Sequence, residues 1–370
     1  MIKIKKHLTI LLVLISAIIL IAHPKNVVII MGDGMGYNHL LLSEFLAEIN
    51  DLEIATNKFQ VASLVRNETV DNIVTDSAAA ATAFLCGQKT KLGYLGMDKD
   101  QNPIYSIATI LKKEGYKIGL ITNTKFSDAT PAAMYAHTFR DDKNKIIEDL
   151  IDSDFLDFFV AGGLEDLGVN PFTLKPTSKS PLKKINEKGY KIYGINYEPL
   201  FDSSDDKFMA FVSLGHKSFE NQLNAGEPTY LEIIEKTISK INFNDPLFLF
   251  VECGRIDHAS HINDEKALKA ELVMFQKIVD YLTNVFSPED TLFIIFADHE
   301  TGGLSLLSSP TKSDDISIKW NATDHTATYI PFLTYGNSKD IFPKHMHHED
   351  VKNTLLKILE IEISEGVYAR

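Results

Sequence analysis

Cysteine and arginine are scarce in this chain of 370 residues, which holds two cysteines and four arginines. The cysteines are Cys86 and Cys253, and an oxidising compartment would permit them to form one disulfide. Each of them lies in an apolar run near a candidate active-site residue. We therefore expect two buried free thiols rather than a disulfide.

Positive charge is also in deficit, since the formal net charge is −13 and the sequence pI is about 5.4. Such an acidic chain is poorly suited to bind nucleic acid or an anionic membrane through a basic surface, and we expect no nucleic-acid binding. A site for an anionic substrate must be a local exception, built from metal ions or a few well-placed cations. The arginines available for it are Arg66, Arg140, Arg255 and Arg370.

The composition is otherwise that of a globular protein, with 45% hydrophobic and 24% charged residues. At the N-terminus, Lys3, Lys5 and Lys6 precede an apolar stretch that ends at Ala22 and is short for a membrane span. Residues 1–22 are therefore predicted to be a signal peptide or an N-terminal membrane anchor, and the protein is predicted to be exported, periplasmic or extracellular. Residues 23–370 are predicted to form the catalytic domain.

Apolar, β-rich runs alternate with helix-like stretches along this domain. The predicted strands are 27–31, 117–122, 158–161, 208–214, 247–251, 292–297 and 329–335, and the predicted helices include 104–114, 230–241 and 264–286. Near-continuous apolar strands of this kind predict an α/β fold with a mostly parallel central sheet and helices on both faces. Residues 164–206 are rich in Lys, Pro, Ser and Gly, and are interpreted as an excursion from the sheet rather than a separate domain.

Polar side chains follow several predicted strands at the point where each strand ends. They are Asp33, Asn123, Glu252 and Asp298. Ligands of open α/β sheets bind beyond the carboxyl ends of the strands, so these side chains should converge on one edge. Asp33 is also flanked by glycines in the segment 32–36, which keeps bulky neighbours away from a ligand, although a turn or a helix cap would explain it equally well.

Ser77 begins the alanine-rich segment 75–83, which is a strong helix former. Asp76 or Ser77 could simply cap this helix. Alternatively, Ser77 is a nucleophile, which requires activation by a base or a metal, and free N–H groups at the helix start would favour a phosphoryl group there.

Candidate metal ligands gather in three later segments. Asp257 and His261 stand at i and i+4 after Glu252, Asp298 and His299 are adjacent, and His325 precedes the last apolar strand. Mixed Asp, His and Glu ligands suit zinc where histidine is present and magnesium where all ligands are oxygens. Two or more such ions fit an in-line phosphoryl displacement. A further histidine segment, 345–348, is interpreted as a solvated, charged stretch.

In their order and spacing, these motifs resemble those of the alkaline phosphatases, which hydrolyse phosphate monoesters. The resemblance rests on segments 32–36, 75–79, 128–133, 252–261, 298–303 and 325–326, which span nearly the whole predicted domain. It implies that Ser77 forms a phosphoserine intermediate. It further implies two zinc ions, one held by Asp257, His261 and His325 and the other by Asp33, Asp298 and His299, and a magnesium ion held by Asp33, Thr130 and Glu252.

The sequence departs from the family pattern in three places. Arg140 matches the phosphate-clamping arginine, but it comes one residue early, and Asp141 at the strictly aligned position could not do that job. Asp128 and His258 are a mixed pair beside the magnesium site, which leaves the identity of the third metal open. The short segment between Gly303 and His325 predicts a reduced peripheral insertion and leaves a homodimer possible.

Two rival functions are retained. A related metal hydrolase could act on diesters, sulfates or phosphonates, because these enzymes share the fold and the paired metals. A protein that binds metal or phosphate without catalysis would use the same scaffold, but it should lack a ligand or the nucleophile, and every expected ligand is present in this sequence.

Overall fold

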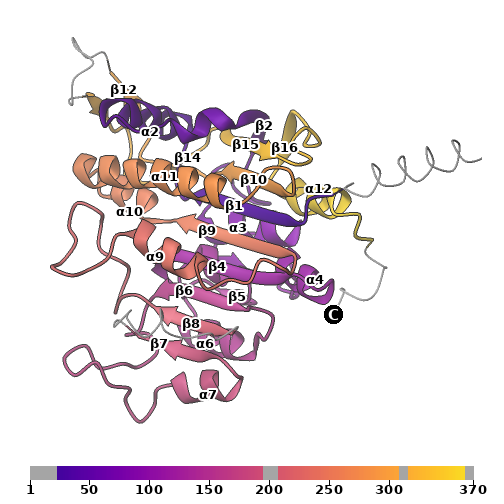
Figure 1. Ribbon diagram of the computed structural model, residues 1–370, viewed down its shortest axis with the longest axis vertical. Helices are drawn as coiled ribbons and strands as arrows, with labels where there is room; N and C mark the ends of the chain where they lie inside the picture. Colours follow the sequence, from indigo (N-terminus) through magenta and orange to yellow (C-terminus); the bar gives the residue numbers. More distant parts are fainter. Residues whose placement is uncertain (1–22, 195–206, 308–315, 363–370) are drawn as a thin grey trace, which may run out of the picture.

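The computed structural model describes residues 23–194, 207–307 and 316–362. Within these residues, ten strands form one twisted sheet in the order β16-β2-β15-β10-β1-β9-β4-β6-β8-β7, from β16 at the top of Figure 1 to β7 near the bottom. The strands are β1 (Asn26–Gly32), β2 (Gln60–Arg66), β4 (Lys117–Lys125), β6 (Phe158–Gly162), β7 (Lys191–Tyr193), β8 (Phe208–Phe211), β9 (Leu247–Cys253), β10 (Thr291–Phe296), β15 (Ile330–Gly336) and β16 (His345–His347).

The seven strands from β10 to β7 are parallel to one another, and β1 lies between β9 and β10. Every residue of β1, β9 and β10 is buried, as expected for apolar strands that are covered on both faces. The predicted α/β fold with a mostly parallel sheet is therefore confirmed. The last predicted strand, β15, differs from its neighbours because it pairs antiparallel with both β10 and β2.

Helices cover both faces of the sheet. On one face α11 (Glu265–Val285) packs against α2 (Tyr37–Ile49), α9 (Tyr230–Ile238) and α10 (Arg255–His261), and on the other α3 (Ser77–Cys86) packs against α4 (Ile107–Lys113), α5 (Ala129–Ala132) and α12 (Asp350–Ile358). Leu268, Leu272, Phe275, Val279 and Leu282 of α11 are all fully buried. This spacing of three and four residues gives α11 one apolar stripe against the core. The remaining helical segments are η1 (Ala55–Lys58), α6 (Lys143–Asp152) and α7 (Leu182–Glu187).

Several short strands form small two-stranded pairs beside the main sheet. They are β3 (Tyr94–Leu95) with β5 (Thr138–Phe139), β11 (Glu300–Thr301) with β14 (His325–Thr326), and β12 (Ser305–Leu306) with β13 (Ile318–Lys319). The β11–β14 pair matters most for function, because it brings the segment of His325 against the segment that follows His299.

Three strands of the main sheet were not predicted from the sequence. Strand β2 has three exposed residues among seven, and β7 and β16 have only three residues each, so none of them forms a long apolar run. Strand β7 joins the edge of the main sheet, which supports the interpretation of the region 164–206 as part of this domain. The last part of that region, residues 195–206, lies outside the described residues. The predicted strand 208–214 is shorter than expected and ends at Phe211.

The interpretation of segment 345–348 as a solvated, charged stretch is wrong for Met346 and His348, although His345 is exposed and His347 lies beside Lys89 and Glu68. Residues 345–347 form β16, which pairs with β2, and His348 is buried with 1% exposure. The imidazole of His348 lies edge-on to the rings of Phe84 and Phe296, and its Nε2 is 3.2 Å from the carbonyl oxygen of Ala297. Apolar packing from α3 and β10 therefore encloses a residue that the sequence places in a charged context.

Cys86 ends α3 and Cys253 ends β9, and both are free, buried thiols, as predicted. The predicted signal or anchor, 1–22, lies outside the described residues, and export stays a prediction. Among the residues that are described, no helix combines the length and apolarity needed to cross a bilayer.

Candidate active site

A cavity of about 640 Å³ opens at the carboxyl edge of the sheet, where the sequence predicts that polar side chains converge. Asp33 follows β1 directly, Glu252 lies at the end of β9, and Asp298 follows β10 by two residues. The cavity is lined by, among others, Asp33, Ser77, Asp128, Arg140, Asp257, His258, His261 and His325. Residues far apart in the sequence thus meet at one site because their strands are neighbours in the sheet.

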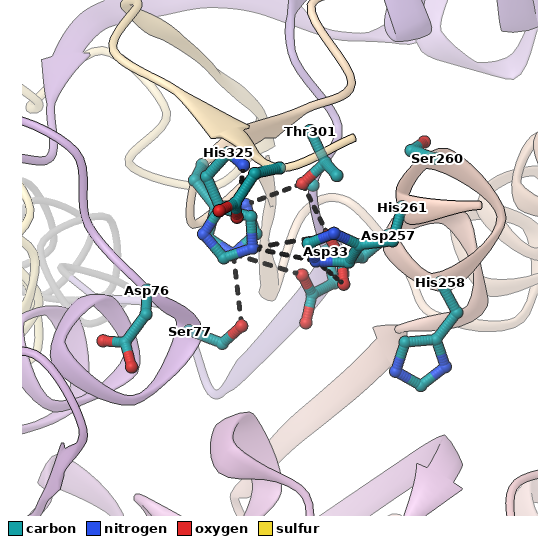
Figure 2. Close-up of polar contacts among 12 residues, drawn as sticks. Asp33, Asp76, Ser77, Asp257, His258, Ser260, His261, Thr301 and His325 are labelled. Carbon is teal, nitrogen blue, oxygen red and sulfur yellow. Dashed lines mark hydrogen bonds and ion pairs between the residues drawn. The ribbon is translucent and has the colours of Figure 1, made fainter. Parts of the chain in front are cut away.

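Ser77 is the first residue of α3, and the cap of this helix is Asp76 rather than Ser77. The Asp76 carboxylate accepts a hydrogen bond of 3.0 Å from the backbone N–H of Ala79. The hydroxyl of Ser77 is therefore not needed as a cap, and its Oγ lies 3.1 Å from Nε2 of His299. Figure 2 shows this hydroxyl pointing toward the cluster of imidazoles and carboxylates, while Asp76 points away from it.

Asp33, Asp298 and His299 form the first group of candidate metal ligands, and all three are buried. Nε2 of His299 lies 3.1 Å from Asp298 Oδ2 and 3.6 Å from Asp33 Oδ1. Burial, together with the nearby charges of Asp298 and Asp257, raises the pKa of Asp33 well above its usual value. Asp33 Oδ1 has no hydrogen-bond partner in the described part of the chain. A divalent cation would satisfy this atom and offset the carboxylate repulsion, so the group fits a metal ion.

Asp257, His261 and His325 form the second group. The i, i+4 spacing on α10 brings His261 Nε2 to 3.3 Å from Asp257 Oδ2, and strand β14 places His325 Nε2 3.1 Å from His261 Nε2. Nδ1 of His261 faces the carbonyl oxygen of Thr323 at 2.7 Å, and Nδ1 of His325 faces that of Thr75 at 2.8 Å. Each Nδ1 must therefore carry a proton, and both Nε2 atoms face the centre of the group, where a metal ion would replace any proton on them; this is the arrangement that metal-binding histidines adopt.

Thr301 connects the two groups, although sequence reasoning did not select it as a site residue. Its hydroxyl donates a hydrogen bond of 2.5 Å to Asp257 Oδ1 and lies 3.1 Å from Nδ1 of His299. The same hydroxyl can thus accept the proton of His299 Nδ1–H while it donates its own. The only feature of the sequence that pointed to Thr301 was its position two residues after His299, in the segment 298–303, which was selected because of Asp298 and His299.

Gly34 is required where the two groups approach each other. Its φ is +69°, a value that favours glycine, and a Cβ at this position would lie 2.8 Å from both Asp257 Oδ1 and Thr301 Oγ1. Its backbone N–H donates a hydrogen bond of 3.1 Å to Asp298 Oδ1. The glycine therefore lets the backbone pass between the two candidate metal groups and hold one of their ligands.

Asp33, Thr130 and Glu252, the predicted magnesium ligands, also lie together. Thr130 Oγ1 donates to Asp33 Oδ2 at 3.3 Å. Glu252 Oε2 accepts hydrogen bonds from Thr122 and Thr124, while its buried Oε1 has no partner in the described part of the chain. Burial, and then the charge of Asp128, raises the pKa of Glu252 to about 8. Oxygen ligands around an unpaired buried carboxylate oxygen fit a hard cation such as magnesium.

A third histidine-containing group, Asp128, His216 and His258, lies beside the magnesium ligands, and His216 was not predicted from the sequence. His258 Nε2 lies 3.4 Å from Asp128 Oδ2, and Nδ1 of His258 lies 2.7 Å from a guanidinium nitrogen of Arg255. Because arginine can only donate, His258 Nδ1 is the acceptor and Nε2 keeps its proton toward Asp128. This is the reverse of the pattern in His261 and His325, and it makes the group a hydrogen-bonded set rather than a ready metal site.

Arg140 reaches the same cavity as Ser77. Its Nη1 donates a hydrogen bond of 2.9 Å to Asp76 Oδ2, and Gly93 N–H donates to the same oxygen at 3.0 Å. Asp76 therefore both caps the helix of Ser77 and holds the arginine beside it. Asp141, the strictly aligned residue, is exposed and is not among the residues that line the cavity.

Asn123 positions the metal-binding helix α10, although it lies within β4 rather than after it. Its Oδ1 accepts hydrogen bonds from the backbone N–H groups of Gly254 and Arg255, at 2.8 and 3.2 Å. Its Nδ2 donates to Glu271 Oε2 at 3.4 Å. The side chain thus satisfies the start of α10, whose free N–H groups would otherwise be buried without partners.

The family model described as "Alkaline phosphatase" matches residues 24–162 and 178–361 of the chain. Among curated proteins, the chain is 29% identical over 317 residues to the repressible alkaline phosphatase of Saccharomyces cerevisiae, covering 76% of this chain and 55% of that protein. It is 24% identical to alkaline phosphatase 4 of Bacillus subtilis, with 92% and 89% coverage. The chain spans little more than half the length of several curated relatives that it matches.

Solved structures give the same result for the fold. The alkaline phosphatase from the Antarctic bacterium TAB5 superimposes with a TM-score of 0.79 at 25% identity, covering 92% of this chain and 99% of that one. The Thermus thermophilus alkaline phosphatase has a TM-score of 0.81 at 19% identity, with 92% of each chain covered. The whole described arrangement, with its sheet and both helical layers, is therefore shared with these structures.

Proposed function

Because this chain belongs to the alkaline phosphatase family, we propose that it hydrolyses phosphate monoesters through a phosphoserine intermediate at Ser77. One observation carries the proposal. The Nε2 atoms of His261, His299 and His325 converge with buried aspartates directly beside the Ser77 hydroxyl. This geometry provides a nucleophile and two groups of metal ligands within one cavity, as an in-line phosphoryl transfer requires.

Two zinc ions held by these groups, with a magnesium ion at Asp33, Thr130 and Glu252, would supply positive charge that lowers the pKa of the serine hydroxyl and of the departing oxygen. The residues of the chain have separate tasks. Ser77 attacks phosphorus, and the start of α3 directs backbone N–H groups toward the phosphoryl oxygens. Arg140, oriented by Asp76, donates hydrogen bonds to the same oxygens. Thr301 keeps Asp257 and His299 in place.

Arg140 also favours phosphate monoesters over diesters. A monoester has three unesterified oxygens, so the guanidinium can bind two of them and leave one for the metal groups, whereas a diester has only two unesterified oxygens in all. The presence of the nucleophile and of all the candidate ligands in one cavity also speaks against a binding protein without catalysis.

The test compares Ser77→Ala with Ser239→Ala, an exposed serine directly after α9 that serves as the matched control. We expect Ser77→Ala to lose most turnover of an aryl phosphate, and chelation of wild type to do the same until zinc and magnesium are restored. Trapping of radioactive phosphate on wild type at acid pH, and not on Ser77→Ala, would identify the intermediate. Full activity in Ser77→Ala or in the chelated enzyme would refute the proposal, and faster hydrolysis of a diester would favour the alternative.

A further inference from the structure

Apart from the hydrogen-bonded pair of Asp128 and His258, four residues line the cavity without a task in the proposed chemistry: Asn72, Val74, Leu92 and Asp324. They form the walls beyond the phosphoryl site. Val74 and Leu92 are apolar, Asn72 is polar but uncharged, and Asp324 is a carboxylate. Arg140 is the only lysine or arginine among the lining residues, and its guanidinium is already engaged by Asp76 and reserved for the phosphoryl group. The walls therefore contain a fixed negative charge and no positive partner for a second anionic group.

Asp324 lies on the side of the cavity where the leaving group would depart. Ser77 Oγ contacts His299 of the first metal group. An in-line displacement places the leaving oxygen opposite the attacking oxygen, which is toward the group of Asp257, His261 and His325. Asp324 borders that group, since it precedes His325 directly and follows Thr323, whose carbonyl oxygen lies 2.7 Å from His261 Nδ1.

The Asp324 side chain is exposed but held in one place. Its Oδ1 accepts a hydrogen bond of 2.8 Å from the backbone N–H of His325, and its own carbonyl oxygen accepts one of 3.0 Å from Gly302. The carboxylate is therefore anchored at the mouth of the cavity rather than free to swing into solvent. On the neighbouring walls, Val74 is partly buried and Leu92 is 39% exposed, so both offer apolar surface to a leaving group.

We propose that this site selects phosphate monoesters whose leaving group is uncharged or cationic, and that Asp324 is the residue that discriminates against leaving groups with further negative charge. This inference rests on the proposed function. The charge of bound metals would be matched by the surrounding carboxylates and by the phosphoryl dianion. Of the other carboxylates that line the cavity, Asp76 is paired with Arg140 and Asp128 with His258. A second anionic group on the substrate therefore meets the Asp324 carboxylate, which is unpaired in the described part of the chain, whereas a cationic group is attracted to it.

The experiment uses three aryl phosphates that differ only in a ring substituent: a carboxylate, an uncharged methyl ester, or a quaternary ammonium. In the wild-type holoenzyme, kcat/KM should rise from the first to the third. In Asp324→Asn, which keeps the size and the Oδ1 acceptor for His325, the ratio of cationic to anionic substrate should fall roughly fivefold, as expected for one charge at short range in partly screened surroundings. Leu92→Lys should lower the same ratio by adding a cation to the cavity wall.

Asp245→Asn is the matched control, since Asp245 is exposed and precedes β9 at the opposite edge of the sheet; it should leave the ratio unchanged. Equal kcat/KM for the three esters in wild type, or an unchanged ratio in Asp324→Asn, would overturn the inference. Affinities of the corresponding aryl phosphonates for metal-loaded Ser77→Ala give the same ratio without turnover. If no ester is hydrolysed, the proposed function fails, and the phosphonate affinities alone decide the charge preference.

Discussion

The three candidate metal-ligating histidines and the buried His348 have opposite surroundings. His261, His299 and His325 face carboxylates through Nε2, and a carbonyl or hydroxyl oxygen accepts at each Nδ1. His348, at the end of β16, faces the rings of Phe84 and Phe296 and a single carbonyl oxygen. Burial alone therefore does not make a histidine a metal ligand. The ligand role requires a carboxylate at one ring nitrogen and a hydrogen-bond acceptor at the other.

The pKa of each imidazole follows its own surroundings rather than its group. Hydrogen bonding to Asp257 raises the pKa of His261 to about 9, whereas burial lowers the pKa of both His325 and His348 to about 4. The imidazole of His261 lies beside the Asp257 carboxylate, whose negative charge stabilises either a proton or a metal ion. The imidazole of His348 lies among aromatic rings, where only the neutral form is stable.

The largest contrast is expected between His325→Ala and His347→Ala. Removal of His325 takes one of three ligands from the second metal group, and the loss of metal affinity should exceed the roughly 100-fold typical of outer-shell partners. His347 contacts Lys89 and Glu68 at the edge of the sheet and should be replaceable without effect on metal content. Zinc per chain after dialysis against a weak chelator measures both. If both variants retained the same amount of zinc, His325 would not differ from the β16 histidine His347 as a metal ligand.

A smaller effect is expected for His348→Phe, measured as a pH dependence of stability. The unfolded chain binds a proton at His348 below its ordinary pKa of 6.5, while the folded chain resists it down to about 4. His348 therefore leaves stability intact above pH 6.5 and reduces it progressively as the pH falls toward 4. At pH 5 the loss is about 2 kcal/mol.

His348→Phe should abolish that portion of the acid sensitivity, whatever it does to stability at pH 8. Urea unfolding of metal-free wild type and variant at pH 8 and pH 5 gives the two differences, and the other titrating groups cancel between them. The same acid sensitivity in both proteins would show that His348 is solvated or charged in the folded state.

The smallest of these effects should come from Asn123→Ala, which tests whether the metal ligands depend on support from outside their own helix. Loss of the bonds to Gly254 and Arg255 should loosen α10 and weaken metal binding roughly tenfold. The rate of zinc release to a chelator measures this, with the exposed Asn242→Ala as the control. A lower melting temperature of the metal-free protein with an unchanged release rate would instead make Asn123 a purely structural residue.

Much of the architecture follows from local pattern. Predicted strands 27–31, 247–251 and 292–297 match β1, β9 and β10 to within two residues, because continuous Val, Ile, Leu and Phe runs stabilise strands that are buried on both faces. The edge strands β7 and β16, and β2 beside β16, could not be predicted in this way. Their stability comes from pairing with a neighbour rather than from their own apolar content.

The candidate ligands could likewise be chosen from the sequence. Asp257 and His261 are four residues apart, which places them on one face of a helix, and Asp298 and His299 are adjacent in the chain. Sequence alone thus determined the α/β class, the strands of the centre of the sheet and the residues able to hold metal. Only the tertiary structure decided that Asp76 is the helix cap and Ser77 faces the site, that Thr301 contacts both metal groups, and that Asp324 lines the cavity. These roles depend on which strands become neighbours in the sheet. Strands that pair are far apart in the sequence, so the local sequence pattern does not show which of them will pair.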